Sequence, residues 1–293
     1  MSGRRLVLER EAKLASLLPP AAGRRLEASG VLAGEGCFYV VFDNGPDIGR
    51  VGAELSAGAD GNGLIPQDRG RRAGFEDIAH DAVAGRYNVL VEAQARGRGF
   101  MAEVQEYDLD LAYLGRAWLD FPLDGLNKGL EGLTCVHRQR RTWLLGLCEG
   151  NRCRDGAEGR RPGGGRIQVF ERGRRHWDHA ATIRLPATLG FQDFSSLAVA
   201  GDRLAVLSQE SSALWVGHLK PSAWELADEG EVRTFPPDSQ GRTVYCNVEG
   251  VSWISPDRVV VVSDRAKRNG RQDDHCRAKD QSIHVFTIPD VVG

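Results

Sequence analysis

Acidic residues occupy two fixed places in a pattern that the chain repeats five times. In three copies a glutamate opens the pattern: Glu76, Glu131 and Glu249. A second acid lies at or near the end of a strongly apolar segment in each copy, and these acids are Asp43, Glu92, Glu149, Glu210 and Asp264. Carboxylates held close together raise one another's pKa or bind a cation, and hard cations such as Ca²⁺ prefer oxygen ligands. If the fold gathers these residues, a calcium site is predicted at Glu76, Glu131, Glu249, Asp43, Glu92, Glu149 and Asp264. Taken singly, each acid is equally well explained as a solvated residue at a strand end.

Two long segments rich in arginine supply the opposite charge. They are NRCRDGAEGRRPGGGR, residues 151–166, and AKRNGRQDDHCRAKD, residues 266–280. Cationic side chains next to a bound metal ion would hold a phosphate or carboxylate between them. The candidate ligand-binding residues are Arg152, Arg265 and Lys267. The alternative, a solvated run of charges without a ligand, stays open.

The pattern also predicts the elements that position these residues. Each copy joins a three-residue motif to an apolar segment with strand character, and the motifs begin at residues 29, 76, 131, 195 and 249. The intervals between these starts are 47, 55, 64 and 54 residues, which suits one four-stranded β-propeller blade each. Helical signals are nearly absent, and EREAKLASLL is the best of them.

Alternating segments supply the remaining strands. RIQVFERG and HAATIRLP follow the third motif, and ALWVGHLK and EVRTFP follow the fourth. The fifth copy ends with SIHVFTIP and lacks a fourth strand, which RRLVLER near the N-terminus can supply without leaving an exposed edge. We therefore predict a single all-β domain over residues 1–293, a β-propeller with four-stranded antiparallel blades. Residues 1–26 would form its closing strand and lead-in. Five blades are favoured, six stay open, and an all-β sandwich is the alternative fold.

Propeller geometry predicts where the repeated acids lie. The innermost strand of each blade lines the channel and the second strand runs antiparallel to it. The start of the first strand and the end of the second therefore meet at one face, together with the loop to the third strand. Both groups of acids and both basic segments are expected at this mouth of the channel. His80 is expected near the far end of its strand, which makes it a weak candidate for a catalytic base.

Composition excludes several classes of protein. The 38 basic and 40 acidic residues nearly cancel, which argues against a nucleic-acid-binding protein that relies on a positive field. No run of 18 apolar residues is present, so no membrane span is expected. The N-terminal segment shows no secretory signal, so a cytoplasmic location is expected. The six cysteines are then expected to be mostly free thiols, and Cys148 and Cys153 lack a second pair at zinc-finger spacing. Oligomeric state cannot be predicted.

Three segments resemble two related families of bacterial β-propellers: LNKGLEGLTCV, DFSSLAVAGDRLAVLSQESS and NVEGVSWISPDRVVVVSDRAK. The families are the SdiA-regulated-like proteins and the esterase-like phytases, and the resemblance runs from about Glu27 to the C-terminus. It implies acidic residues and a calcium ion at the channel mouth, and the matching positions are Glu131, Glu249, Glu76 and Asp264. The chain departs from the family in lacking an export signal, and in having Ser29 and Ser195 where other copies have glutamate.

Two kinds of function are compatible with these features. The first is a metal-assisted hydrolase of a phosphoester or ester, in which calcium polarises the substrate and a carboxylate at the mouth acts as base. The alternative is a non-catalytic propeller that binds a small anionic ligand or a protein partner. P-loop, G-x-S-x-G and H-E-x-x-H motifs are absent, so the chemistries that depend on them have no support.

Overall fold

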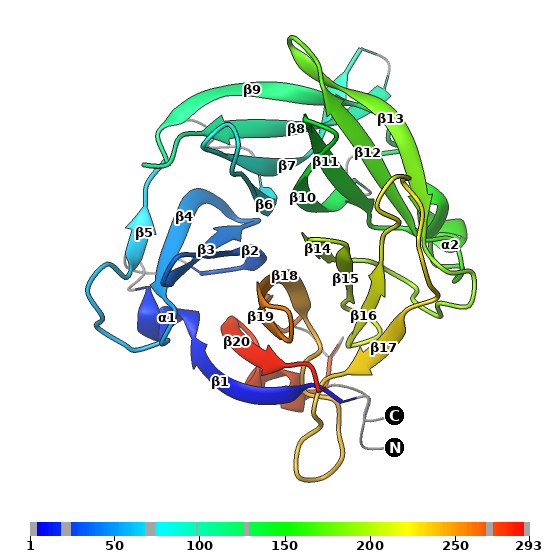
Figure 1. The fold of residues 1–293 in the computed structure, drawn as a ribbon. Coiled ribbons are helices and arrows are strands. Elements are labelled where there is room, and N and C mark those ends of the chain that lie inside the picture. The colour runs from blue at the N-terminus through cyan, green and yellow to red at the C-terminus, as the bar shows by residue number, and fades with distance from the viewer. Residues whose placement is uncertain are drawn as a thin grey trace.

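The structure, a computed structural model, describes residues 5–18, 25–67, 74–97, 99–125, 129–267 and 272–289. Nearly all of their regular secondary structure is β-strand, and the strands are arranged in sheets around a central axis (Figure 1). The helical segments are single turns: α1 (Leu14–Leu17), α2 (Gly156–Gly159), and the 3₁₀ turns η2 (Asn151–Cys153) and η3 (Asp274–Ala278). No helix within these ranges is long and apolar enough to cross a membrane.

The strands form five consecutive four-stranded sets, each antiparallel and each beginning next to the axis. The first set contains β2 (Ala28–Gly34), β3 (Cys37–Phe42), β4 (Gly45–Gly52) and β5 (Gly63–Ile65). The second set contains β6 (Phe75–Asp81), β7 (Arg86–Arg96), β8 (Gly99–Tyr107) and β9 (Tyr113–Asp120). The third set contains β10 (Leu130–Arg138), β11 (Arg141–Cys148), β12 (Arg166–Arg172) and β13 (His176–Arg184). The fourth set contains β14 (Ser196–Ala200), β15 (Arg203–Ser208), β16 (Ala213–His218) and β17 (Glu231–Thr234). The fifth set contains β18 (Val248–Ser255), β19 (Arg258–Ser263), β20 (Ser282–Thr287) and β1 (Val7–Lys13).

Hydrogen bonding joins the second and third sets into one sheet of eight strands. Three residue pairs make this junction, from His176 opposite Trp118 to Asp178 opposite Asp120, and here β13 runs parallel to β9. The other three sets are separate four-stranded sheets in the described part of the chain. The predicted all-β propeller is therefore confirmed. The number of blades depends on whether the eight-stranded sheet is counted as one blade or two, and five stays a prediction.

The N-terminal strand closes the ring as predicted. Strand β1 pairs antiparallel with β20, from Val7 opposite Thr287 to Lys13 opposite Ser282. The segment that looked most helical in the sequence is mainly this strand, because only Leu14–Leu17 forms a helical turn. Pairing with β20 satisfies backbone groups that would otherwise leave an open sheet edge.

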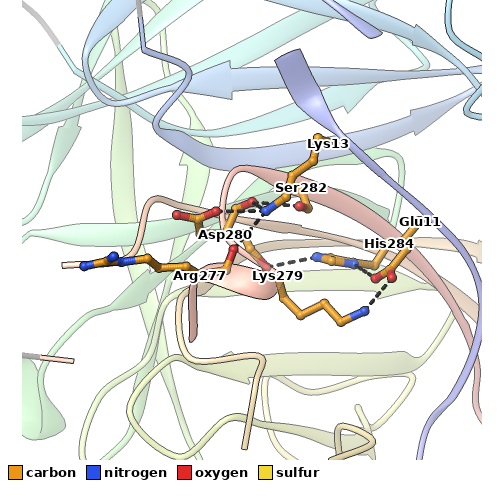
Figure 2. Close-up of polar contacts among 8 residues, drawn as sticks. Glu11, Lys13, Arg277, Lys279, Asp280, Ser282 and His284 are labelled. Carbon is orange, nitrogen blue, oxygen red and sulfur yellow. Dashed lines mark hydrogen bonds and ion pairs between the residues drawn. The ribbon is translucent and has the colours of Figure 1, made fainter. Parts of the chain in front are cut away.

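Side chains reinforce this closure (Figure 2). Lys13 Nζ donates a hydrogen bond to Asp280 Oδ1 at 2.8 Å, and Lys279 donates to the carboxylate of Glu11. Glu11 also lies 3.1 Å from Nδ1 of His284, which is fully buried. The hydrogen bond with His284 lowers the pKa of Glu11 to about 2, and burial lowers the pKa of His284. The closing strand is thus held by a polar network around the buried His284 as well as by its backbone.

Apolar side chains fill the spaces between neighbouring sets. Leu145 and Val169 of the third set pack in one cluster with Leu204 and Trp215 of the fourth. Central strands are covered on both faces by adjacent sheets, which explains uninterrupted apolar runs such as residues 259–262 in β19. Packing between sets therefore fixes the positions of the inner strands around the axis.

The prediction of mostly free cysteines is wrong for four of the six. Disulfides join Cys148 to Cys153 and Cys246 to Cys276, with Cα atoms 5.2 and 5.5 Å apart. The second bridge links residues 30 positions apart in the sequence, so spacing alone could not reveal it. The prediction of free thiols depended on the expected cytoplasmic location, because disulfides persist mainly in oxidising compartments. The location itself stays a prediction.

Candidate functional site at the acidic end of the channel

A break in regular pairing occurs where the inner strands begin. Pairing shifts between Ala28 and Gly30, and corresponding shifts occur at the start of β6, β10 and β18. The residues skipped by these shifts are Ser29, Glu76, Glu131 and Glu249. Directly before β14, the N–H of Ser195 bonds to the carbonyl of Leu207, whose strand partner is Ser196. A bulge bends the strand and redirects a side chain, so the first motif position leaves the regular face of each sheet.

The second strands end beside these bulges. The N–H of Asp43 bonds to the carbonyl of Glu27 at 3.0 Å, and the N–H of Asp264 bonds to the carbonyl of Asn247 at 2.8 Å. Glu149 makes the corresponding bond, at 3.2 Å, to a residue just before β10. The acids after the second strands therefore lie at the same end of the sheets as the glutamates of the motifs, and we refer to it as the acidic end.

The pKa values report how closely these acids approach one another. Burial raises the pKa of Glu249 well above its ordinary value, and the negative charges of Asp264, Asp193 and Glu76 raise it further. Burial likewise raises the pKa of Asp264 to about 7, with a contribution from the charge of Asp43. Because these residues belong to different sets, carboxylates from around the ring share one electrostatic environment.

Asp264 combines this raised pKa with an unsatisfied oxygen. Its Oδ1 is buried and has no hydrogen-bond partner among the described residues, and the same holds for Nδ2 of Asn247. A buried carboxylate oxygen without a donor is costly when it is charged, and a proton or a cation removes that cost. Asp264 is therefore the member of the acidic end most in need of a proton or cation.

Asp77 lies buried among the inner strands and was not singled out from the sequence. Its Oδ2 accepts hydrogen bonds from the N–H of Leu133 at 2.9 Å and from Ser196 Oγ at 3.1 Å. Its Oδ1 accepts from the N–H of Ile78, and Ser196 Oγ accepts in turn from the N–H of Val251. One side chain thus connects the inner strands of several sets, and burial raises its pKa well above the ordinary value.

The sequence did contain a signal for this residue. The second motif position is glycine in three copies, aspartate in one and serine in one: Gly30, Asp77, Gly132, Ser196 and Gly250. A Cβ atom at Gly30 would lie 2.6 Å from the Cα of Asp77, and one at Gly250 would lie 2.8 Å from the Cα of Gly30. The glycines therefore let the strands approach closely enough for one aspartate and one serine to join them.

Two clefts open beside the acids. The first has a volume of about 420 Å³, and its lining includes Asp193, Gln209, Glu210, Arg154, Arg160 and Lys267. The second, of about 440 Å³, shares Gln209, Glu210 and Lys267 with the first. Gln209 also donates a hydrogen bond to Glu249. Lys267 lies close enough to Glu249 and Asp264 for its charge to lower the pKa of both, which offsets part of their rise.

The other predicted site residues contribute unequally. Arg152 is exposed and donates to the carbonyl of Arg161, while Arg265 forms an ion pair with Glu27 at 3.3 Å. Neither lines the two clefts, whose cationic residues are Lys267 and two arginines that we did not select. Among the predicted acids, Asp43 is exposed, whereas Glu76, Glu131 and Glu149 are partly buried. Glu92 belongs to β7, and its side chain lies outside the described residues.

Asp193 is a second acid that was missed. It lies just before the fourth motif, where its Oδ1 accepts a hydrogen bond from Ser208 Oγ at 2.6 Å and from the N–H of Glu210 at 3.1 Å. Burial raises its pKa, and the charge of Glu210 contributes. Its position in a connecting loop, outside both repeated places, concealed it in the sequence.

Ser263, His284 and Glu11 have the residue types of a Ser–His–acid triad. Ser263 Oγ lies 3.2 Å from Nε2 of His284, and Glu11 faces Nδ1 of the same ring. The exposed fractions of Ser263 and His284 are only 1% and 0%. A nucleophile must reach its substrate, so this buried arrangement stabilises the closing strand and is not the candidate active site.

No protein-family model matches the chain, and a search of curated proteins finds no match. Among solved structures, it is similar to the glutaminyl cyclase of Myxococcus xanthus, with 11% identity, a TM-score of 0.56 and coverage of 99% of this chain and 100% of the cyclase. It is also similar to the GH43_1 enzyme of Xanthomonas citri, with 12% identity, a TM-score of 0.53 and coverage of 94% and 90%. Identities this low show the fold alone, which is that of bacterial propeller-type enzymes. The resemblance to SdiA-regulated-like proteins and esterase-like phytases has no family match and stays a hypothesis.

Proposed function

We propose that the protein is a hydrolase of a phosphoester or ester, that its active site is the acidic end of the channel, and that a bound calcium ion assists it. The observation that supports this most directly is Asp264, whose Oδ1 is buried without a hydrogen-bond partner in the described part of the chain. Its pKa of about 7 is suited to proton transfer near neutral pH.

Glu249 lies near Asp264, and the two carboxyl groups can take different roles in proton transfer. Burial raises the pKa of Glu249 well above its usual range, and it raises the pKa of Asp264 to about 7. Two neighbouring carboxyl groups with raised pKa values can serve as acid and base when one of them holds a proton and the other has lost it. In this proposal Asp264 accepts a proton from the attacking water, and Glu249 donates one to the leaving group.

A hard cation fits the chemistry of these donors. The acidic end offers carboxylate oxygens, and Ca²⁺ takes six to eight oxygen ligands that commonly include water. Within the described residues, however, the groups whose ligand atoms lie within 4.8 Å of one another do not include these acids. Calcium would therefore be held by one oxygen of the ionised Asp264 with water as further ligands, where it would polarise a substrate oxygen, while Glu249 keeps its proton.

The clefts supply binding groups for an anionic substrate. Lys267 lines both clefts, and Arg154 and Arg160 line the cleft of about 420 Å³. Guanidinium groups form charge-assisted hydrogen bonds with phosphate or carboxylate. Lys267 and the two arginines would hold the substrate's anionic group, with its scissile bond near Asp264.

Hydrolysis assays test the proposal. The substrates are p-nitrophenyl phosphate, bis-p-nitrophenyl phosphate and p-nitrophenyl acetate, each with added Ca²⁺ and with a chelator. Loss of a general base commonly reduces the rate about 100-fold or more, so Asp264→Asn should lower kcat to this extent. The matched control is Glu225→Gln, which removes an exposed carboxylate whose partner is Lys220. Wild-type protein without activity on any of these substrates, or Asp264→Asn with unchanged kcat, would contradict the proposal.

A non-catalytic role is the second candidate, and the cationic lining of the clefts supports it. A propeller that only binds a small anion should bind phosphate or citrate in a calorimetric titration and show no turnover. Lys267→Ala should weaken this binding, whereas Lys220→Ala, which removes a surface lysine, should leave it unchanged. If the protein instead binds only a protein partner, it should bind neither phosphate nor citrate, and Lys267→Ala should then have no effect in this titration.

A further inference from the structure

A cluster of potential metal ligands lies at the opposite end of the channel. Asp81 is the last residue of β6, while Cys135 and His137 lie two positions apart in β10. Residues two apart in a strand point to the same side of the sheet. As a result, the carboxylate of Asp81, the thiol of Cys135 and the imidazole of His137 each place a ligand atom within 4.8 Å of the other two.

The separations fit tetrahedral zinc. Nε2 of His137 lies 3.3 Å from Oδ1 of Asp81 and 3.9 Å from Sγ of Cys135. Usual zinc bond lengths to nitrogen, oxygen and sulfur place tetrahedral N and O ligands about 3.4 Å apart, and N and S ligands about 3.6 Å apart. Both separations from His137 Nε2 are therefore within a few tenths of an ångström of those around one zinc ion, and the Asp81 and Cys135 ligand atoms lie within 4.8 Å of each other.

Surrounding groups orient the ligands. Thr142 Oγ1 lies 3.2 Å from Nδ1 of His137, which leaves Nε2 directed at the cluster. The N–H groups of Val83 and Ala84 donate to Oδ1 of Asp81 at 3.1 and 2.9 Å. Hydrogen bonds from a second layer of groups characteristically fix the ligands of metal sites, and the tautomer of a ligating histidine in particular.

The other groups of ligand types in the described residues are less suitable. In one, Cys246 and Cys276 are joined by a disulfide and offer no thiolate. In another, Asp120, His176 and Asp178 are all exposed. The cluster of Asp81, Cys135 and His137 instead combines a buried carboxylate with a free thiol.

Cys135 is a free thiol that is only partly exposed. A divalent cation binds the thiolate and balances the carboxylate, so metal uptake releases the thiol proton to solvent. Cys135 and the adjacent His80 also line a cavity of about 200 Å³ among the inner strands, which gives an ion and a water ligand a route to the cluster.

We propose that Asp81, Cys135 and His137 form a zinc site, with the fourth position taken by water. One nitrogen, one sulfur and one oxygen ligand suit this borderline-soft ion and do not suit calcium. This site is separate from the acidic end and does not depend on the function proposed there.

Cobalt substitution tests the site directly. Protein freed of metal by a chelator, with its disulfides intact, is titrated with Co²⁺ and followed by optical absorption. A tetrahedral Co²⁺ ion bound to a thiolate gives a sulfur-to-metal charge-transfer band and intense visible bands. We expect both to saturate at one equivalent and to disappear on addition of Zn²⁺. Wild-type protein that lacks the charge-transfer band would overturn the proposal.

Variants identify the ligands. Cys135→Ser should abolish the charge-transfer band, and His137→Gln should weaken Co²⁺ binding by at least about tenfold. Cys37→Ser is the matched control, because Cys37 is the other free thiol and is not part of the cluster. If Cys135→Ser retains the band, or Cys37→Ser loses it, the assignment is wrong.

A measurement on the wild-type protein remains decisive if a variant fails to fold. Zn²⁺ should slow alkylation of Cys135 by iodoacetamide at least about tenfold, as read by mass spectrometry of the modified peptide. Calcium at the same concentration should not slow it. Equal alkylation rates with and without Zn²⁺ would overturn the site.

Discussion

The two ends of the channel are constructed differently. At the acidic end, the inner strands begin with irregular pairing, and long connections such as residues 149–165 and 264–281 lie between strands. At the opposite end, the first and second strands of each set are joined by tight turns. Gln139 and Arg140 form one of these, both with positive φ, as expected for a two-residue hairpin loop. Next to the axis, the opposite end is therefore formed by tight hairpins, and its long connections, residues 53–62 and 219–230, join the third and fourth strands.

The cysteines divide in the same way. Cys148–Cys153 and Cys246–Cys276 both lie in or beside the long connections of the acidic end. The free Cys37 begins β3, directly after a tight turn of the opposite end. Disulfides are therefore present where the chain is long and irregular, and absent where hydrogen-bonded hairpins already hold it.

The comparison separates what the repeat provides from what is specific to this chain. Bulges and acids recur in successive sets, so the acidic end is a product of the repeated motif. The cluster of Asp81, Cys135 and His137 draws on two sets only and has no counterpart in the motif. The chemistry of the acidic end should accordingly depend on several acids together. Metal binding at the opposite end should depend on each of its three ligands individually.

The largest effect that we expect concerns the disulfides of the acidic end. Loss of the bridge across 30 residues should lower the free energy of unfolding by about 3.6 kcal/mol, and loss of the bridge across 5 residues by about 2 kcal/mol. The variants are Cys246→Ser with Cys276→Ser, and Cys148→Ser with Cys153→Ser, compared by urea denaturation.

A thiol titration of the denatured, unreduced wild-type protein accompanies this measurement. It should find two free thiols per chain, since four of the six cysteines are bridged. If six free thiols are found and the double variants are as stable as the wild type, then disulfides do not stabilise the acidic end, and the cysteines do not distinguish the two ends.

A slightly smaller effect is expected for Asp77, which lies on the same strand as Asp81 but near the acidic end. Asp77→Ala leaves the buried donors of Leu133, Ile78 and Ser196 without an acceptor, at a cost of roughly 3 kcal/mol. Asp81→Ala removes two bonds within a turn that water can replace, at a cost of about 1 kcal/mol. Thermal or urea unfolding measures both.

Asp77→Asn distinguishes loss of the acceptor from loss of the carboxyl group itself. The amide oxygen still accepts from Leu133 or Ser196, so this variant should recover part of the lost stability. If Asp77→Ala is no less stable than Asp81→Ala, the connection between sets through Asp77 does not stabilise the ring.

The fold could be predicted because each copy of the pattern has the same order of short motif, turn and apolar strand. An apolar run such as residues 259–262 must be buried on both faces, and a sheet between two neighbouring sheets provides this. Closure by the N-terminal strand followed from one missing strand in the fifth copy, and β1 confirms it. The acids after the second strands could be placed because antiparallel hairpins bring those ends to the starts of the inner strands.

What could not be predicted depends on contacts between distant segments. Cys246 meets Cys276 only because two long loops meet at the acidic end, and no regular spacing encodes this. Asp77 lies next to Glu76 in the sequence, and its position among the inner strands follows from glycines in other sets. Asp81 and His137 were overlooked because a metal site assembled from two strands leaves no short motif.

The smallest effect concerns pH, and it separates the acids of the two ends. Asp264 has a folded-state pKa of about 7, raised from 3.8 by burial. Between these values the folded protein keeps the proton that the unfolded chain has lost, so stability falls as pH rises from about 4 to about 7. Three pKa units at about 1.4 kcal/mol each set an upper limit, and partial solvent access reduces the expected change to roughly 2 kcal/mol. The free energy of unfolding of Asp264→Asn relative to wild type should therefore increase by this amount across that range.

Taking the difference between the two proteins cancels the opposite trend from Glu11, whose pKa is lowered. Glu35→Gln, an exposed change at the opposite end, should show no such trend. Saturating Ca²⁺ should flatten the wild-type profile, because a cation at Asp264 replaces the proton. If the free energies of unfolding of wild type and Asp264→Asn depend on pH in the same way, water reaches the carboxylate of Asp264 freely. The acids of the two ends would then not differ in their pKa values.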